Sequence, residues 1–464
     1  MSVQLPELFK ARMRRLLGGA YARFLAGYDA PPRRGLRVNT LKCGAGSLRA
    51  LLPLSLEPVP WCPDGFSFEG EWKAGADPLH HAGAYYMQEP SAMTAAAALA
   101  PRPGERILDL CAAPGGKSTQ IAAALRGEGL LWSNEVVRPR AQILAQNLER
   151  CGVRNAVLSS CGVEALCAGL PGWFDGVLVD APCSGEGMFR KEPEALSGWS
   201  VDNIRLCAAR QREILRAAAG AVRPGGRLAY STCTFAPEEN EGIAAWFLRE
   251  FPEFSLEEIP VGFGVPGLPW EAVSPFVPDV EGGGLPLARC RRIFPGQGGE
   301  GHFVALFRRA ADAPGAPSPH AYAYALDAAV RMETEKLLAS CLSVPPWGEP
   351  AAAGGQIRLL PPGLPELKGL GVLSAGTAAA DICRNRLEPC HALFLAARRE
   401  DCAQCLDLPL GDPRLAAFLR GEEIEAGGLQ GWTAVAAAGV TAGFGKASGG
   451  RLKNRYPKGL RLRG

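Results

Sequence analysis

The stretch ERILDLCAAPGGK, residues 105–117, decides the fold of this chain. It begins with the short apolar run Ile107–Leu110, which predicts a buried strand. Small residues and proline follow, and then Ser118 opens an apolar helical pattern. A strand, a glycine-bearing turn and a helix N-terminus form a site for polar or anionic ligand groups, because the backbone N–H groups of residues 115–117 can point at the ligand. The alternative is an ordinary tight turn between a strand and a helix.

The length and composition indicate a multidomain globular protein. The chain has 464 residues, of which 47% are hydrophobic and 21% charged, so packed cores in several domains are expected. No apolar run approaches the roughly 20 residues of a spanning helix, and the N-terminus lacks the apolar core of a signal peptide. An odd count of 15 cysteines without an export signal favours reduced thiols, so we expect a cytoplasmic protein with no membrane contact. The net charge is only +3, so any basic partner surface must be local.

Strand-like and helix-like segments alternate from about residue 94 to residue 309. This alternation predicts an α/β fold with a mostly parallel, doubly wound sheet and helices on both faces. The predicted strands are 105–110, 130–135, 156–160, 174–180 and 227–232, and the predicted helices are 118–126, 138–151, 201–221 and 237–250. Two later strand-like runs, 288–294 and 302–308, flank the glycine-rich PGQGGEG and predict an antiparallel closing hairpin.

Chemically unusual segments follow the predicted strands, where ligands of such sheets bind. They are residues 111–117, Glu135, residues 180–190 (DAPCSGEGMFR) and residues 231–234 (STCT). Glu135 ends the second strand, a little under 20 residues past the glycine loop, where an acid can accept hydrogen bonds from ribose hydroxyls. Cys183 and Cys233 each lie in a turn facing the predicted cleft. A lone cysteine is most often a buried small hydrophobe, but a thiolate is the nucleophile needed to activate an unreactive pyrimidine carbon.

A P-loop NTPase is an alternative from a different class. Its pattern G-x-x-x-x-G-K-[ST] is nearly matched by Gly116–Ser118, although Cys111 occupies the first glycine position. Asp180 after GVLV also resembles the Mg²⁺-binding acid of such proteins. This alternative leaves the two cysteines without a role. A dinucleotide oxidoreductase would carry G-x-G-x-x-G in the first turn, which this sequence lacks.

Taken together, CAAPGGK, NE, DAPCSGEG and STCT resemble the Sun/nucleolar-protein family of RNA 5-methylcytosine methyltransferases over residues 1–309. GLRVNTLK, VPWCPDGF, YYMQEPSAM and GKASGGRLKNRYPKGLR are similar to the branch of bacterial 16S ribosomal RNA methyltransferase F. The resemblance implies a Rossmann-like S-adenosylmethionine methyltransferase that modifies cytosine C5 in RNA, with 16S ribosomal RNA as the expected target. Transfer RNA or large-subunit ribosomal RNA as the target, and a non-catalytic RNA-binding protein, remain alternatives.

The resemblance also implies roles for individual residues. Cys233 would add to C6 of the cytosine as a covalent adduct, so that C5 can attack the methyl group of S-adenosylmethionine. Cys183 would assist release, and Asp180 would bond the base edge and border the cofactor. Glu135 would hold the cofactor ribose. The methionine end of the cofactor is expected on Cys111, Ala112, Ala113, Pro114, Gly115, Gly116 and Lys117.

The sequence leaves two contacts undecided: the one to the adenine of the cofactor and the one made by Lys117. Other members of the family carry an acid after the third strand for the adenine amino group, but this chain has Cys161 or Gly162 there. The backbone or Ser160 is expected to make that contact instead. Lys117 either steers cofactor or substrate charge, or orients Asp180, or forms a structural salt bridge.

Aromatic residues near the predicted cleft have two interpretations each. Tyr85, Tyr86 and Gln88 either line a ligand mouth or pack at a domain seam. Phe189 and Arg190 either hold RNA near the cleft, where a flipped base would enter, or support the loop by packing.

We expect an N-terminal RNA-binding region (1–93), a methyltransferase domain (94–309), a linker (310–322), a first C-terminal subdomain (323–395) and a PUA-like RNA-binding domain (396–464). From Lys446 onward there are seven Lys and Arg residues and no acid, so phosphate binding is expected there, with a solvated tail as the alternative. No metal is expected, because the C-terminal cysteines match no clean zinc spacing. The expected partner is RNA, bound by a monomer.

Overall fold

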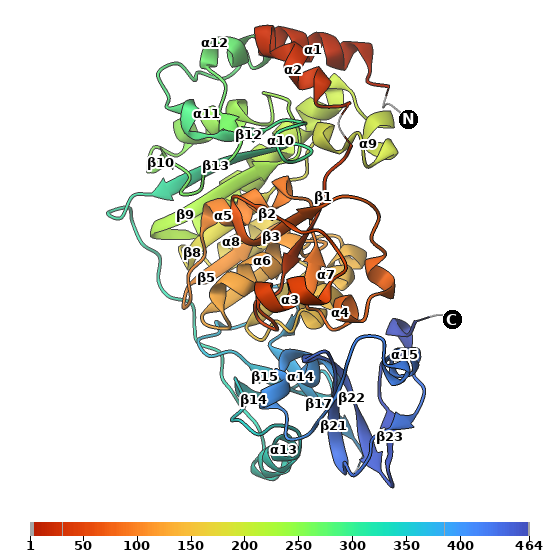
Figure 1. The fold of residues 1–464 in the computed structure, drawn as a ribbon. Coiled ribbons are helices and arrows are strands. Elements are labelled where there is room, and N and C mark those ends of the chain that lie inside the picture. Colours follow the sequence, from red (N-terminus) through yellow and green to blue (C-terminus); the bar gives the residue numbers. More distant parts are fainter. Residues whose placement is uncertain (1–3, 30, 385, 463–464) are drawn as a thin grey trace.

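The computed structural model describes residues 4–29, 31–384 and 386–462. The described residues form a ten-stranded central sheet, a four-stranded N-terminal sheet and two C-terminal sheets of four and five strands (Figure 1). The N-terminal helices lie at the top of the view and the C-terminal sheets at the bottom. Among the described residues, no helix has the length and apolar character needed to cross a membrane.

The central sheet carries the candidate site. Its order is β11-β12-β13-β9-β8-β5-β6-β7-β16, with β10 also paired to β13. The strands are β5 (Arg106–Asp109), β6 (Leu130–Asn134), β7 (Ala156–Ser159), β8 (Phe174–Asp180), β9 (Val222–Thr232), β10 (Phe254–Glu257), β11 (Val265–Pro266), β12 (Arg291–Ile293), β13 (His302–Arg309) and β16 (Val372–Ala375). β7, β6, β5, β8 and β9 run parallel, and the strands beyond them pair antiparallel. The predicted parallel sheet with a closing antiparallel hairpin, β12 and β13, is therefore confirmed.

Helices cover both faces of this sheet. They are α5 (Thr94–Leu99), α6 (Gly116–Leu125) and α7 (Arg138–Arg150) on one face, and α8 (Val163–Gly169), α10 (Val201–Ala221) and α11 (Glu241–Glu250) on the other. Alternate strand residues enter opposite cores: Ile107 packs with the first set of helices and Leu108 with the second. Burial on both faces explains why the strands read as continuous apolar runs.

Several element boundaries differ from the predicted ones. β9 begins at Val222 rather than at residue 227, and α11 begins at Glu241 rather than at residue 237. Residues 237–240 form a turn in which the N–H of Asn240 donates to the carbonyl of Pro237. The turn leaves its polar side chains free for tertiary hydrogen bonds, as described below.

β16 lies within the predicted first C-terminal subdomain but joins the central sheet. It pairs antiparallel with β7, and the backbone N–H of Ser160 donates to the carbonyl of Gly371. The open edge of a sheet offers unpaired N–H and C=O groups to any strand that reaches it. A four-residue strand is too short to show a periodic pattern, so the sequence does not reveal this pairing.

The N-terminal and C-terminal regions share one hydrophobic core. The N-terminal sheet contains β1 (Arg34–Val38), β2 (Glu57–Val59), β3 (Cys62–Phe68) and β4 (Tyr85–Met87), with α3 (Ala45–Leu51) and α4 (Pro78–His81). Its Leu36 and Phe66 belong to the same buried cluster as Phe418 and Leu452 near the other end of the chain. The His81 ring also lies 3.0 Å from the Tyr456 hydroxyl. Chain ends that are distant in sequence are thus packed together.

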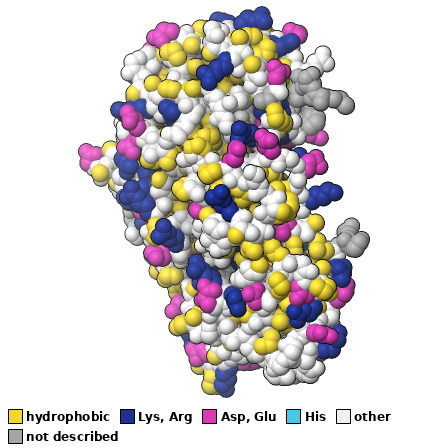
Figure 2. All heavy atoms as spheres, in the orientation of Figure 1, with side chains coloured by type: hydrophobic (Ala, Val, Ile, Leu, Met, Phe, Trp, Pro, Cys, Tyr) yellow, Lys and Arg dark blue, Asp and Glu magenta, His cyan; other side chains and the backbone are white. Residues whose placement is uncertain are grey.

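The C-terminal sheets follow the linker. The first contains β14 (Glu349–Ala353), β15 (Gln356–Leu360), β17 (Thr377–Cys383) and β18 (Arg386–Pro389), near α13 (Ala328–Cys341) and α14 (His391–Ala396). The second contains β19 (Cys405–Leu408), β20 (Ile424–Glu425), β21 (Gly431–Ala437), β22 (Val440–Ser448) and β23 (Arg451–Asn454), with α15 (Pro413–Arg420). Three basic residues of the predicted tail, Lys446, Arg451 and Lys453, therefore lie on strands β22 and β23. Figure 2 shows Lys and Arg side chains interspersed with Asp and Glu on the visible face of the molecule.

The basic N-terminal helix packs on the central domain. α1 (Glu7–Leu17) and α2 (Tyr21–Ala26) bury an apolar stripe that includes Phe9, Met13 and Phe24. Arg12 also donates to both carboxylate oxygens of Glu238, at 2.7 and 2.8 Å. This helix is thus fixed beside the loops that follow β8 and β9.

Candidate active site

A cleft of about 940 Å³ opens at the carboxyl ends of the parallel strands. Because β5, β6, β8 and β9 run parallel, their following loops meet at one edge of the sheet. The predicted site residues that line the cleft are Cys111, Ala113, Glu135, Asp180, Cys183 and Cys233. Its volume suits a small-molecule ligand. The structure therefore brings together residues that the sequence places in four separate segments.

The two cysteines meet within this cleft. Asp180 at the end of β8 pairs with Ser231 of β9, so the turns that follow these strands are neighbours. The Sγ atoms of Cys183 and Cys233 are 3.3 Å apart, and both side chains are partly buried. The hydrogen bond with Cys233, and then burial, raises the pKa of Cys183 well above its ordinary value. Two thiols so close together in a partly dry site do not both ionise readily.

Buried side chains clamp the loop that carries Cys183. The Gln211 amide donates to the carbonyl of Pro182 at 2.9 Å and to Glu239 Oε2 at 2.8 Å. The backbone N–H of Ser184 donates to the same carboxyl oxygen at 3.0 Å. Both neighbours of Cys183 are thus held, and burial raises the pKa of Glu239 to about 8.

A second set of hydrogen bonds joins this loop to the turn of Cys233. The hydroxyls of Ser184 and Thr234 are 2.8 Å apart, and Thr234 donates to Glu186 Oε2 at 3.0 Å. The backbone N–H of Gly187 donates to the carbonyl of Cys233 at 2.8 Å. These bonds fix the spacing of the two sulfur atoms, because each turn is anchored to the other.

Asp180 lies at the centre of a charged group beside the cysteines. Lys117 Nζ contacts Asp180 Oδ2 at 2.7 Å, and the Ser231 hydroxyl donates to Oδ1 at 2.7 Å. Burial would raise the pKa of Asp180, but the charge of Lys117 and these hydrogen bonds hold it below its ordinary value, and His302 adds to this effect when its ring is protonated. The pKa of Lys117 is raised because the attraction of Asp180 outweighs burial. Both groups are therefore charged at neutral pH.

His302 is a member of this group that the sequence analysis missed. It is the first residue of β13 and is 4% exposed, and its Nε2 lies 3.7 Å from Asp180 Oδ1. The only trace in the sequence is its position at the start of a predicted strand, after a glycine-rich turn. It reaches the site only through the pairing of β13 with β9.

The CAAPGGK loop is shaped by tertiary contacts. Gly115 adopts φ 113°, which favours glycine, and a Cβ on Gly116 would lie 3.3 Å from the Tyr86 ring. The side chains of Arg140 and Asn147 donate to the carbonyls of Ala113 and Pro114, at 3.0 and 2.9 Å. Cys111 and Ala113 line the cleft, whereas Ala112 and residues 114–117 do not, and Lys117 instead contacts Asp180.

Glu135 follows β6 with its carboxylate at the cleft wall. Its Oε1 accepts the backbone N–H of Val137 at 2.9 Å, and its Oε2 pairs with Arg140 at 3.3 Å. The side chain is 4% exposed, so these contacts hold it in one orientation. A carboxylate fixed in this way can accept hydrogen bonds from two neighbouring hydroxyls of a ligand.

The part of the cleft wall that follows β7 differs from one expectation, that Ser160 would contact the adenine. Gly162 and Glu164 line the cleft, whereas Ser160 does not. The Ser160 hydroxyl instead donates to the carbonyl of Val136 at 3.4 Å. A contact through the backbone at residue 162 is therefore better placed than one through Ser160.

Tyr85, Gln88 and Phe189 are packing residues and do not line the cleft. Tyr85 is fully buried and its hydroxyl donates to Asp77 at 2.6 Å, and Gln88 is buried against Arg37. Phe189 is 2% exposed, with its ring 5.2 Å from the ring of Phe9.

Arg190 belongs to the same support. It donates to Glu300 at 2.8 Å and to the carbonyl of Gly27 at 3.1 Å. The packing interpretation of Phe189 and Arg190 is therefore the one that the structure supports.

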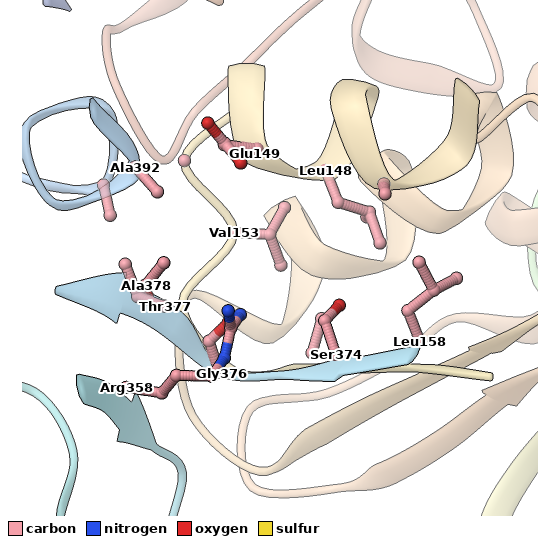
Figure 3. Close-up of a pocket in the computed structure, with 14 residues that line it drawn as sticks. Leu148, Glu149, Val153, Leu158, Arg358, Ser374, Gly376, Thr377, Ala378 and Ala392 are labelled. Atoms are coloured by element: carbon pink, nitrogen blue, oxygen red, sulfur yellow. The ribbon is translucent and has the colours of Figure 1, made fainter. Parts of the chain in front are cut away.

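A smaller cavity of about 160 Å³ lies between α7 and the first C-terminal sheet (Figure 3). Its lining is dominated by alanine, with Glu149 and Arg358 as the charged side chains. Arg358 is occupied by the carbonyls of Ala375 and Gly376, at 2.7 and 2.8 Å. The lining includes no cysteine, so this cavity offers none of the sulfur chemistry of the cleft.

The described cysteines of the C-terminal region are not gathered into a group of candidate metal ligands. Within residues 4–29, 31–384 and 386–462, no group of three or more His, Cys, Asp or Glu side chains is arranged to hold a metal ion. Burial raises the pKa of both Cys390 and Cys402. These thiols behave as small buried side chains.

Comparisons with known proteins match three segments of the chain. Residues 96–308 match the family model "16S rRNA methyltransferase RsmB/F". Residues 5–90 match "N-terminal domain of 16S rRNA methyltransferase RsmF", and residues 405–462 match "Methyltransferase RsmF PUA domain". These models lie in the order that the sequence motifs predict.

Individual relatives agree with the family models. The ribosomal RNA small subunit methyltransferase F of Citrobacter koseri is 39% identical over 330 residues, which cover 68% of this chain and 66% of that protein. The same-named protein of Escherichia fergusonii is 38% identical over 330 residues, with the same shares covered. The aligned part thus spans just under two thirds of the length of these relatives.

Two solved structures share the fold. A methyltransferase homolog protein from Pyrococcus horikoshii is 31% identical, with a TM-score of 0.58, covering 66% of this chain and 96% of that one. NSun6 from the same organism, solved with SFG, is 22% identical with a TM-score of 0.55, covering 67% of this chain and 99% of that one. The second likeness speaks for the fold alone.

Proposed function

The chain belongs to the 16S rRNA methyltransferase RsmB/F family, and from this membership we propose that it methylates C5 of a cytosine in RNA, with S-adenosylmethionine as the methyl donor and 16S ribosomal RNA as the substrate. The observation that carries the proposal is the pair of thiols 3.3 Å apart, in a cleft that also holds Asp180. A P-loop NTPase is set aside because the residues of its near-match lie within a methyltransferase family model.

The cleft fits S-adenosylmethionine. Its wall carries the carboxylates of Glu135 and Asp180, which suit a sulfonium cation and the ribose hydroxyls. Asp109 beneath the loop is fully buried, and its Oδ1 has no hydrogen-bond partner among the described residues. Cys111 and Ala113 would hold the methionine end, and the backbone near Gly162 would face the adenine. When bound, the cofactor supplies an electrophilic methyl group.

The chemistry requires a nucleophile because cytosine C5 is too electron-poor to take a methyl group unaided. Cys233 is proposed to attack C6, which turns C5 into an enamine-like carbon. Asp180, held by Lys117 and Ser231, is proposed to bond the N3 and N4 edge of the base as the adduct forms. Cys183 then assists release once C5 has lost its proton.

The division between the two cysteines follows the family resemblance. The geometry is consistent with it, since the Cys233 turn is fixed by the Gly187 hydrogen bond and the Cys183 loop by Gln211 and Glu239. Two sulfur atoms held at this distance can act on adjacent carbons of a single ring. A flipped base is required, because C6 is inaccessible in a stacked strand.

RNA binding is proposed for the N-terminal region and for the PUA domain. Trp432 of the PUA domain has Lys446 above its ring at 5.1 Å and Arg455 at 5.8 Å from the centroid. An aromatic ring flanked by cations suits an RNA strand, because bases stack and phosphates pair with the charges.

The proposed domain boundaries lie at residues 93, 309, 322 and 395. The first C-terminal subdomain also supplies strand β16 to the central sheet.

The target is tested by bisulfite mapping of ribosomal and transfer RNA from a deletion strain. The proposal expects one or more cytosines of 16S ribosomal RNA to lose methylation and to regain it with the intact gene but not with Cys233→Ala. Loss confined to transfer RNA or to large-subunit RNA would keep the chemistry and change the substrate. Isothermal calorimetry with S-adenosylmethionine and with ATP tests which ligand the cleft binds. Tight binding of ATP without binding of S-adenosylmethionine would overturn the proposed methyl donor. An unchanged methylation map together with RNA binding would favour the non-catalytic alternative.

A further inference from the structure

His302 occupies a position in the active site that no motif indicates. β13 pairs antiparallel with β9, and Phe303 lies opposite Thr232. Continued by one residue, this register places the backbone of His302 opposite that of Cys233, the residue that follows β9. Its Nε2 is 3.7 Å from Asp180 Oδ1, and the ring is almost fully buried. The buried side chain thus lies against the proposed base-edge acid, on a strand that pairs with the strand leading to the proposed nucleophile.

The two ring nitrogens have different surroundings. Nε2 has no hydrogen-bond partner among the described residues. The hydrogen bond of the ring goes to the backbone of Gly301, and it favours the protonated ring, as donation to a carbonyl does. In the neutral ring Nδ1 therefore carries the hydrogen, and Nε2 presents a lone pair to the Asp180 carboxylate.

The charges around His302 keep the ring neutral. Burial, and then the charge of Lys117, lower its pKa to about 4, although Asp180 opposes this effect. The titratable groups that act on it are Lys117 of α6 and Asp180 of β8. From β12 it faces Ile293, which is apolar. At neutral pH two acceptor atoms thus face each other without a proton between them.

We propose that His302 is a positioning residue that gives Asp180 a second acceptor for the proton released when Cys233 attacks the cytosine. This inference rests on the proposed cytosine C5 chemistry. A proton placed between Nε2 and Oδ1 satisfies both acceptors, which a partly buried site otherwise leaves in repulsion. The arrangement can therefore take up one proton close to the base edge that needs it.

The step balances without an outside acid or base. The S–H bond of Cys233 breaks and an S–C6 bond forms. The C5=C6 electron pair becomes the C4=C5 bond, and the C4=N3 pair passes to N3. N3 takes up the proton that sulfur lost, and Nε2 and Asp180 Oδ1 hold that proton in the interval. Because the proton never leaves the site, adduct formation does not depend on solvent pH in the range where thiols ionise.

The test is the pH profile of adduct formation in the full-length protein. In a Cys183→Ala background, the rate of covalent trapping of substrate RNA with S-adenosylmethionine is measured from about pH 6 to about pH 9, on either side of the ordinary thiol pKa. With His302 present the profile is expected to be flat. With His302→Phe, which keeps a ring and removes both nitrogens, the thiol proton must go to solvent. The rate should then fall by up to about tenfold per pH unit on the acid side, as expected when a thiol must lose its proton to solvent before it reacts, and the deficit should shrink as the pH rises.

His391→Phe is the matched control. His391 is also a buried neutral histidine, with its pKa lowered to about 3 and Nδ1 unpartnered among the described residues, but it lies on α14 against Tyr456. It does not line the cleft, so its variant should keep the flat profile. His302→Gln is a second variant. It keeps polarity but cannot hold a proton, so it should show the same slope as His302→Phe.

The outcomes separate the two proposals. An equal loss at every pH in both His302 variants, or no loss, would overturn the role of His302 and leave the proposed function standing. Absence of any adduct in the Cys183→Ala background at every pH would remove the proposed function, and the inference with it. Calorimetric binding of S-adenosylmethionine and the thermal melting curve of each variant show whether the cleft is still folded.

Discussion

The Sγ atoms of Cys183 and Cys233 are 3.3 Å apart, although 50 residues separate them in the chain. The pairing of β8 with β9 sets the two turns side by side, and hydrogen bonds from Gln211, Ser184 and Gly187 fix their spacing. A single cytosine ring can therefore meet both sulfur atoms in one pose. This relationship makes the roles of the two cysteines separable by experiment.

We expect Cys183→Ala to accumulate a covalent RNA–protein adduct, because Cys233 can still attack while release is impaired. Cys233→Ala should abolish both methylation and adduct. Denaturing gels with labelled RNA measure the adduct, and Cys207→Ala, at a buried cysteine on α10 outside the cleft, is the control. An adduct in the Cys233 variant and none in the Cys183 variant would reverse the assignment.

Lys117→Met should shift the acid limb of the kcat/KM profile to higher pH. Lys117 is the main group opposing the effect of burial on Asp180, so without it the pKa of Asp180 rises and the carboxylate protonates at higher pH. We expect kcat to fall by about 10²- to 10³-fold, the loss typical of removing a group that stabilises charge in the transition state. Lys117→Arg keeps the charge and should lose less. An acid limb that stays in place in Lys117→Met would show that the pair is only structural.

The stability of the protein should fall as the pH is lowered from about 6.5 toward about 4. His302 and His391 have pKa values lowered to about 4 and about 3, whereas the unfolded chain has the ordinary value. In this range the unfolded chain binds more protons than the folded one, so protonation favours unfolding, and above it these residues contribute no pH dependence. Each contributes up to about 1.4 kcal/mol per pH unit.

Urea unfolding at a series of pH values measures this dependence. His391→Phe, which leaves the cleft intact, should reduce the slope by about 1.4 kcal/mol per pH unit between pH 6.5 and 4. A slope equal to that of the unchanged protein would contradict the assignment of a buried neutral ring.

RNA affinity should depend on the cations around Trp432. Lys446→Met is expected to reduce the slope of log Kd against log salt by about 0.7, the value for one phosphate contact with a single strand. Trp432→Ala should cost about 1–3 kcal/mol of binding with little change in that slope, because stacking is not a charge effect. Lys336→Met, an exposed lysine on α13, is the control. Equal effects of Lys446→Met and Lys336→Met would exclude a specific RNA contact at Trp432.

Sequence reasoning was sufficient for the parallel sheet and the family. The strand and helix patterns of residues 94–309 are local, since each depends on apolar periodicity within one segment, and the sheet with its closing hairpin is confirmed. The motifs around Cys111, Asp180 and Cys233 are long enough to indicate the family, and the family models match the same order. The residue roles stay predictions.

The sequence by itself determined where the strands end and which chemical groups stand there, because both depend on residues that are neighbours in the chain. Only the tertiary structure decided which groups meet. It placed His302 beside Asp180, added β16 to β7, and joined the N-terminal sheet to the PUA domain in one core. It also turned Phe189 inward against Phe9. These contacts come from strand pairing and side-chain packing between distant segments, and such long-range contacts leave no periodicity in the segments that make them.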